Sequence, residues 1–361
     1  ACCLSEAGPG WARLRLATLG PLARPACHSR AEGGPGGRKP ARQKHARARV
    51  LPCELEEKSG VRSSVRSRRR AGMTRPVHWS FSGAGLLGGY FVGVWERLVA
   101  GDVPSALFCP ARSRFVGTSA GSFVAVACAS GVSQADAADT FAQLLQSVHN
   151  ASPLRGAPFP CGAHPAKCPS LIPLSQWAGA LGCDLLSLVR PELEALLPED
   201  AHERCSGRVE VALVDSRSFP RLVATRRSTF ESRSDLVDAC LASAYLPGIT
   251  SSAHPAPKHF GGLLDGGILD NFPRGSEPGS RTIIVSPFGG DFDISPTSFA
   301  DGSDAGTAPW RVPISPGVWI DVASVNQLHR VVRIGEPAAA EELVRQGFDD
   351  CSRFLRRNGH V

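Results

Sequence analysis

The residue of this chain that most favours chemistry is Ser119. It lies at the centre of Gly117–Gly121, a Gly-Thr-Ser-Ala-Gly run that follows the β-prone pair Phe115 and Val116 and precedes an alanine- and valine-rich stretch. A serine on a sharp strand-to-helix turn presents its hydroxyl at the positive end of a helix dipole, and small residues must flank it. We therefore predict that Ser119 is a nucleophile and that Gly117 and Gly121 make room for it. An ordinary tight turn is the alternative.

Asp265 is the candidate base for this serine, because an unassisted hydroxyl is a weak nucleophile. It ends the apolar segment Phe260–Asp265, and Gly266 and Gly267 follow at once, so that backbone can approach the carboxylate closely. A free aspartate has a pKa near about 4, which is too low for a base at neutral pH, and burial would have to raise it. The alternative is that Asp265 only caps an Asp-Gly turn.

A glycine-rich turn, Ser82–Gly89, lies between a strand-like run and a helical run that starts at Tyr90. Successive backbone N–H groups in such a turn form an anion-binding nest, which is what an oxyanion hole requires. The candidate donors are Gly83, Ala84, Gly85 and Gly88.

The same glycines spell Gly-x-Gly-x-x-Gly, the dinucleotide-binding fingerprint, and Asp102 follows at about the spacing of a ribose-binding acid. However, Asp102 lies in a polar break that is typical of a helix end, and the next strand leads to Ser119. The sequence thus favours an oxyanion hole over a nucleotide site.

Along the chain, the glycine-rich turn at 82–89, the Gly-Thr-Ser-Ala-Gly run at 117–121 and Asp-Gly-Gly at 265–267 together resemble the patatin-like phospholipase family. The sequences of Phe81–Tyr90 and Ile284–Ile294 are similar to those of the adiponutrin and adipose triglyceride lipase branch. The resemblance covers about residues 77 to 357. Plant-type members have Asp and Arg where this chain has Ser82 and Leu87, so the hole would rely on backbone donors alone.

The resemblance implies a Ser119–Asp265 dyad without histidine. Ser119 would attack an ester carbonyl, Asp265 would accept its proton, and water would release the acyl-enzyme. The backbone of residues 83–85 would bind the oxyanion, with Gly266 and Gly267 supporting the acid. The implied substrates are acylglycerols or phospholipids, with transacylase activity as a further expectation, and the implied chemistry needs no cofactor and no metal.

Other arrangements of the same residues remain open. A Ser-Asp-His triad would draw on His329 or His360, although these are more typical of a surface helix and of a chain end. A non-catalytic lipid-surface protein could retain the same fold. Zinc-ligand residue types occur without a standard zinc spacing, so we expect a Pro-rich loop rather than a metal site. These residues are Cys161, His164, Cys168 and Cys183.

Alternating strand and helix patterns predict the α/β class, as a patatin-like three-layer sandwich whose mainly parallel sheet is covered by helices on both faces. The expected strands cover residues 77–82, 113–117, 209–214, 221–226, 260–265 and 281–286, and the expected helices cover residues 87–100, 119–131, 134–148, 185–197, 233–244 and 337–357. Ser119 and Asp265 then fall at the carboxyl ends of strands, where such sheets bind ligands. Residues 151–184 are expected to form an irregular cap.

The 361 residues carry a formal net charge of +7, and the excess is concentrated in residues 1–75, with 17 Lys and Arg against 5 Asp and Glu. We expect this Arg-, Pro- and Gly-rich segment to be disordered and the patatin-like domain to cover residues 76–357. A transit-like leader and a polybasic arm are alternatives. We favour a gene-model extension with translation beginning at Met73, so the basic run indicates no nucleic-acid role.

No stretch of 18 consecutive apolar residues is present, and no signal peptide is recognisable. The twelve cysteines are scattered, so reduced thiols are expected. We therefore predict a cytoplasmic protein that associates peripherally with lipid droplets or intracellular membranes. Its candidate lipid contacts, equally compatible with a protein core, are Leu86, Leu87, Phe123, Tyr245 and Leu246.

Overall fold

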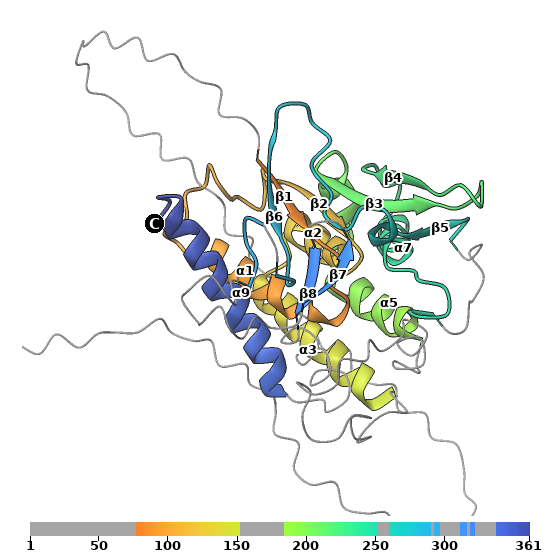
Figure 1. The fold of residues 1–361 in the computed structure, drawn as a ribbon, viewed down its shortest axis with the longest axis horizontal. Coiled ribbons are helices and arrows are strands. Elements are labelled where there is room, and N and C mark those ends of the chain that lie inside the picture. The colour runs from red at the N-terminus through yellow and green to blue at the C-terminus, as the bar shows by residue number, and fades with distance from the viewer. Residues whose placement is uncertain are drawn as a thin grey trace, which may run out of the picture. The chain divides into compact units, whose positions relative to one another are not determined.

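A mainly parallel sheet organises the described part of the chain (Figure 1). The computed structural model describes residues 77–151, 184–251, 260–289, 292–296, 311–315, 318–321 and 337–361. The sheet contains β1 (Val77–Phe81), β2 (Arg114–Thr118), β3 (Val209–Asp215), β4 (Val223–Arg227), β5 (Leu263–Asp265) and β6 (Arg281–Val285). The order is β4-β3-β2-β1-β6, and β5 also pairs with β3. Strands β6, β1, β2 and β3 are parallel, whereas β4 and β5 run antiparallel to β3.

Helices connect and cover these strands. They are α1 (Gly89–Leu98), α2 (Ala120–Ser130), α3 (Gln134–Ala151), α5 (Leu185–Leu196), α6 (Ala201–Cys205), α7 (Arg233–Ser243) and α9 (Pro337–Arg357), with short 3₁₀ turns at Gly85–Leu87 and Gly266–Ile268. Local sequence sets several ends. Ser232 caps α7 by accepting the N–H of Asp235, and Gly131 ends α2 in the left-handed conformation. The α/β sandwich predicted from the sequence is confirmed.

The two faces of the sheet differ in chemistry because successive strand residues point to opposite sides. On one side, Trp79 and Phe81 of β1 lie level with Phe115 and Gly117 of β2. A Cβ placed on Gly117 would lie 2.5 Å from the carbonyl oxygen of Gly121, so α2 packs on this side. We call it the helix face.

The opposite side carries polar residues such as His78 and Ser80. The chain that follows β5 crosses it: Ser80 donates a hydrogen bond to the carbonyl of Pro273, and a Cβ on Gly275 would overlap the ring of His78. We call residues Gly266–Glu277 the strap and this side the strap face. Both residues of β1 are nearly fully buried, as expected for a sheet covered on both sides.

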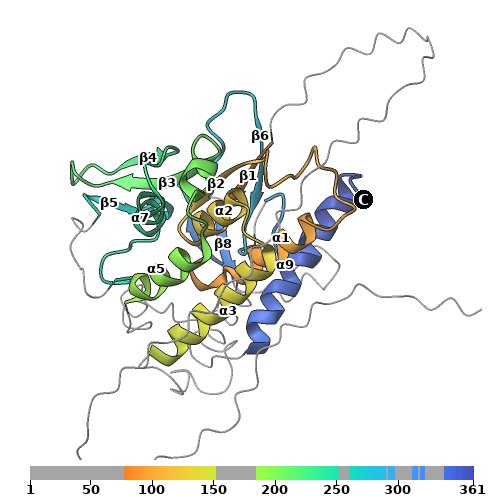
Figure 2. The ribbon, with the colours of Figure 1, turned by 180° about the vertical axis from the view of Figure 1, so that it is seen from behind.

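Helix α9 lies along α1, as Figures 1 and 2 show from opposite sides. Glycines allow a close approach: a Cβ on Gly93 would meet the backbone of Val344, and one on Gly347 would meet the carbonyl of Tyr90. The buried hydroxyl of Tyr90 donates to Asp350 at 2.7 Å. The helix predicted at 337–357 is thus confirmed, and it joins the domain through α1.

The strand predicted at 260–265 is only three residues long, because Gly261 and Gly262 have positive φ angles and form a turn before it. The basic segment 1–75 and most of the expected cap, residues 152–183, lie outside the described residues. Strands β7 (Arg311–Ser315) and β8 (Val318–Asp321) form a separate antiparallel pair that the sequence did not predict.

Candidate active site

Ser119 occupies a strained turn between β2 and α2. Its φ and ψ angles are 52° and −128°, and it is the one non-glycine residue with a positive φ within the described ranges. Its backbone N–H donates to Oγ of Ser243 at 2.9 Å, and that hydroxyl donates to the carbonyl of Ala212 at 2.7 Å. A strained residue held by such contacts is typical of a nucleophile elbow.

The small residues around this turn are sterically required. A Cβ on Gly121 would lie 2.2 Å from the carbonyl oxygen of Phe81, and one on Gly117 would strike Gly121 itself. Both obstacles are backbone atoms, which cannot rotate aside. The geometry therefore agrees with the prediction that Gly117 and Gly121 make room for the serine turn.

Strand pairing explains how Asp265 reaches Ser119. Thr118, the last residue of β2, pairs with Ala212 of β3, and the next residue of β3, Leu213, pairs with Asp265. Strand β5 therefore occupies the place beside β3 that β2 leaves, and the two strands end facing each other. The hydroxyl of Ser119 consequently lies near enough to the carboxylate of Asp265 to influence its pKa.

The carboxylate of Asp265 is buried, with 4% of the residue exposed. Burial raises its pKa to about 6, although the hydrogen bond from the Gly267 N–H, at 2.7 Å, and the nearby hydroxyl of Ser119 act in the opposite direction. A base needs a pKa near its working pH. The pKa of Asp265 is therefore shifted in the direction that a base at this position needs.

The glycine-rich turn lies beside the serine. A Cβ on Gly83 would be 3.4 Å from Cβ of Ser119, and Gly85 has a positive φ of 53°. Among the described residues, none accepts a hydrogen bond from the backbone N–H groups of Gly83, Ala84 and Gly85. Gly88, the fourth candidate, lies one turn further along and caps α1.

An apolar cavity of about 130 Å³ extends from this site. On α2 it is lined by one face of the helix, at Ser119, Phe123 and Ala127, which spans about 12 Å at the rise of an α-helix. The other walls come from α1, α3 and α5. Its apolar lining includes Leu86, Val92, Trp95, Val124, Ala137, Phe141, Leu144, Leu185, Leu186, Val189, Leu193 and Leu196.

Several residues of the site were missed from the sequence. Ser243 lies on α7, and Asn271 lies in the strap, where its Oδ1 would be 2.3 Å from a Cβ on Gly83. Neither residue has a motif of its own that would single it out. The residues of α3 and α5 that line the cavity also gave no local signal, because their apolar periodicity is typical of any helix that packs on a protein core.

Some predicted contacts fall elsewhere. Leu87 and Tyr245 are buried, 1% and 0% exposed, so for these two candidate lipid contacts the alternative of a protein core holds. Leu86 and Phe123 line the cavity instead. The exposed apolar residues beside the site are Ile268 and Leu269, just after Asp265.

The residues of the alternative nucleotide, triad and zinc sites lie apart from Ser119 or outside the described residues. Asp102 lies after α1, where Arg97 binds it with two hydrogen bonds of 2.8 and 2.9 Å, and not at the end of a second strand. His360 packs its ring near Phe354 at the end of the chain. His329 and the cysteine- and histidine-containing segment 161–183 lie outside the described residues.

Comparison with known proteins identifies the class. The model of the patatin-like phospholipase family matches residues 80–276, and the chain belongs to this family. It is 28% identical over 282 residues to human patatin-like phospholipase domain-containing protein 2, covering 78% of this chain and 48% of that protein. It is 30% identical over 178 residues to human patatin-like phospholipase domain-containing protein 4, covering 48% and 64%.

A third relative is named for a different reaction. Human 1-acylglycerol-3-phosphate O-acyltransferase PNPLA3 is 28% identical over 292 residues, which cover 78% of this chain and 50% of that protein. The chain thus spans about half the length of most of the curated relatives it matches. At the level of the family, lipid ester hydrolysis and acyl transfer are the supported activities.

Proposed function

We propose that this protein is a lipid acyl-ester hydrolase that works through a Ser119–Asp265 dyad and an acyl-enzyme intermediate. The observation that carries the proposal is that β2 and β5 end facing each other on β3, which brings the Ser119 turn to a buried carboxylate whose pKa is raised to about 6. Such a carboxylate is charged at neutral pH, yet basic enough to take a proton in the transition state.

The reaction follows from these positions. Oγ of Ser119 attacks the ester carbonyl carbon while its proton passes to Asp265, and the carbonyl electron pair moves onto oxygen. The free N–H groups of residues 83–85 stabilise this oxyanion. When the intermediate collapses, the carbon–oxygen bond of the leaving alcohol breaks and the alcohol takes the proton from Asp265. Water then repeats the sequence on the acyl-enzyme and releases the fatty acid.

The cavity supports an acyl chain as the part of the substrate that is bound. Its lining is almost wholly apolar, and it starts at Ser119, where the ester carbonyl would lie. An apolar chain gains free energy by leaving water for such a surface. We therefore favour acylglycerols or phospholipids as substrates, with triacylglycerol lipase activity as the specific expectation.

The surface around the site supports docking on a lipid surface. Ile268 and Leu269 are 41% and 49% exposed, and Phe219, at the tip of the β3–β4 hairpin, is 78% exposed. The hairpin follows the carboxyl end of β3, so its tip lies at the edge of the sheet that carries Ser119. No helix in the described ranges has the length and apolarity needed to cross a bilayer. We propose peripheral association with a lipid droplet or an intracellular membrane.

The test is labelling and hydrolysis by matched variants. Ser119→Ala and Asp265→Asn should each abolish hydrolysis of a soluble short-chain aryl ester, and Ser119→Ala should also abolish labelling by a fluorophosphonate. The control is Ser218→Ala on the exposed hairpin, which should behave as wild type. A wild-type protein that never labels would contradict the proposal and favour a non-catalytic lipid-surface protein.

Two further arms separate the remaining alternatives. Loss of activity in His360→Ala or His329→Ala with full activity in Asp265→Asn would replace the dyad by a triad. A mixture of acylglycerols and phospholipids, with lysophosphatidic acid as acyl acceptor, then tests substrate and reaction. Release of free fatty acid supports hydrolysis, whereas acylated acceptor without free fatty acid would make this protein an acyltransferase.

A further inference from the structure

Asn271 in the strap brings a side-chain amide to the point where the three turns of the candidate site meet. A Cβ on Gly83 would lie 2.3 Å from its Oδ1, and a Cβ on Gly267 would lie 2.9 Å from the same atom. The amide therefore packs directly against the glycine-rich turn on one side and against the turn after Asp265 on the other. Only glycines at both positions leave room for it.

The amide also lies near the carboxylate. The same Cβ position on Gly267 is 3.0 Å from Oδ1 of Asp265, so the two oxygens are at most about 6 Å apart, within the range at which one charge shifts the pKa of another. Ser119 is adjacent, since its Cβ is 3.4 Å from the Cβ position on Gly83. The amide thus contacts the turns that carry both the base and the proposed oxyanion donors.

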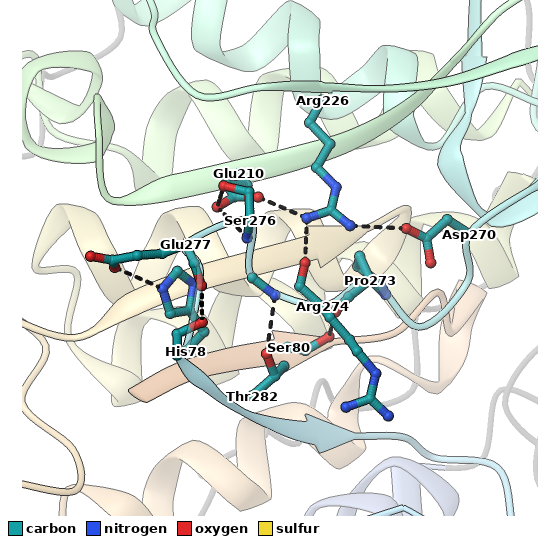
Figure 3. A network of polar contacts seen from close by, with 12 residues as sticks. His78, Ser80, Glu210, Arg226, Asp270, Pro273, Arg274, Ser276, Glu277 and Thr282 are labelled. Atoms are coloured by element: carbon teal, nitrogen blue, oxygen red, sulfur yellow. Dashed lines mark hydrogen bonds and ion pairs between the residues drawn. The ribbon is translucent and has the colours of Figure 1, made fainter. Parts of the chain in front are cut away.

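A set of polar contacts fixes the strap on both sides of Asn271. Immediately before it, the carbonyl of Asp270 accepts a hydrogen bond from Oγ1 of Thr118 at 3.0 Å, which ties the strap to the neighbour of Ser119. The side chain of Asp270 accepts from Arg226 at 3.1 Å, and Arg226 also binds Glu210 at 2.8 Å. Figure 3 shows Arg226 between these two carboxylates.

The part of the strap that follows Asn271 is also held by hydrogen bonds. The hydroxyl of Ser80 donates to the carbonyl of Pro273, and the backbone N–H and hydroxyl of Ser276 both donate to Glu210, at 3.1 and 2.6 Å (Figure 3). Glu210 therefore binds the strap twice, directly through Ser276 and indirectly through Arg226. Strands β1, β3 and β4 all take part, so Asn271 is presented from a rigid support.

We propose that Asn271 is a positioning residue of this site: held by the Arg226–Glu210 contacts, its amide fixes the glycine-rich turn and the Asp265 turn at their working separation. The proposal rests on the dyad function proposed above. Asn271 itself forms no bond to the reacting atoms. Its removal acts by letting the two turns shift and by admitting water to the carboxylate.

The test compares Asn271→Ala with the isosteric Asn271→Asp in the full chain. We measure the rate of fluorophosphonate labelling of Ser119 against pH, with melting temperatures to correct for the folded fraction. Asn271→Ala should lower the rate about 10- to 100-fold, the size expected for a misplaced catalytic group. Water that reaches Asp265 reduces its desolvation, so the acid limb of the pH profile should move to lower pH.

Asn271→Asp should move the same limb in the opposite direction. A second carboxylate disfavours the charged form of Asp265, although Arg226 and Asp270 on the strap face also contribute to the local field. A residue with only a structural role would lower the folded fraction without moving the limb. The control is Ser218→Ala on the exposed hairpin, which should keep the wild-type profile. If Asn271→Ala does not fold, Asn271→Asp carries the test alone.

The outcomes separate the two proposals. A wild-type protein that labels, with both Asn271 variants labelling at the same rate and with the same acid limb, overturns the role of Asn271 and leaves the dyad intact. A wild-type protein that does not label overturns the dyad, and the role of Asn271 with it. Opposite shifts of the limb in the two variants support the positioning role.

Discussion

The helix face and the strap face of the same sheet are built from opposite chemistry. On the helix face, Trp79 and Phe81 pack against other rings and against helices, and both are 0% exposed. On the strap face, the alternate residues His78 and Ser80 of the same strand bind the strap through polar atoms. The hydrophobic effect is non-directional, whereas hydrogen bonds have direction. The first face therefore supplies stability, and the second supplies position.

The candidate site lies at the edge of the sheet where β2 and β5 end, between the layers that cover the two faces. Ser119 begins the helix that packs on one face, and the strap that crosses the other begins directly after Asp265. A shift of either layer would separate the hydroxyl from the carboxylate. The comparison of the faces thus predicts that mutations on the helix face act mainly on folding, and that those on the strap face act mainly on the site.

The largest expected effect is on the helix face. Phe81 is fully buried, with its ring centroid 5.4 Å from that of Phe91 and 6.5 Å from that of Phe115. Phe81→Ala should lower the free energy of unfolding by about 3–5 kcal/mol, because it leaves a cavity. Its neighbour Ser80 points to the strap face, and Ser80→Ala should cost about 1 kcal/mol for the lost hydrogen bond to Pro273. Urea unfolding measures both, and equal costs would contradict the distinction between the faces.

Asp265→Asn should have an intermediate effect on the free energy of unfolding, and this effect should have the opposite sign. Its folded pKa of about 6 exceeds the ordinary value of 3.8, so its contribution to stability is full below about pH 3.8 and is lost as pH rises through 6. At pH 8 the folded protein therefore carries an unfavourable buried charge, and Asp265→Asn should stabilise it by roughly 3 kcal/mol at most. The gain should vanish near pH 4. Urea unfolding at the two pH values checks this, and a destabilised variant at pH 8 would refute it.

The same pKa sets the pH dependence of activity. The base must be deprotonated, so hydrolysis of a soluble ester should fall as the pH is lowered through about 6. Because Asp265→Asn keeps an acceptor for the Gly267 N–H, its loss of activity would reflect the missing base and not a broken turn. An acid limb near pH 4 would show that the carboxylate is not buried in the working enzyme.

The smallest effect is expected from the ion pairs of the strap. Arg226 and Glu210 have side chains 29% and 12% exposed, and partly exposed pairs contribute little to stability. Arg226→Met should therefore lower the free energy of unfolding by only about 1 kcal/mol. It should nevertheless loosen the strap, which faster tryptic cleavage after the exposed Arg274 would report. Unchanged cleavage would show that the other contacts hold the strap alone.

Acid should loosen the strap in the same way. Burial alone would raise the pKa of Glu210, but hydrogen bonds from Ser276 and Arg226 together outweigh it and hold this pKa below its ordinary value. The stability it contributes is therefore present above about pH 4.5 and is lost as pH falls through the lowered pKa. Tryptic sensitivity is best compared between wild type and Glu210→Gln after brief acid exposure, since the variant should lack this dependence.

Much of the fold was predictable because its signals are local. The strand at Val77–Phe81 and helices α1, α2, α3, α5, α7 and α9 followed from hydrophobic periodicity, turn residues and caps, and they begin and end within a few residues of the expected positions. The short helix α6 was not predicted. Ser119 and Asp265 were predictable for the same reason, since each lies in a short run of glycines whose steric role can be read residue by residue.

The sequence by itself determined which residues are candidates for chemistry and which segments form most of the strands and helices, because these depend on neighbours along the chain. Only the tertiary structure decided that β5 pairs with β3 beyond the end of β2, and that Ser243 holds the serine turn. Only the tertiary structure also decided that Asn271 packs between the glycine-rich turn and the turn after Asp265. It also decided that Leu87 and Tyr245 are core residues. Such contacts join residues far apart in the chain, and their geometry is set by the packing of whole layers, which no local pattern encodes.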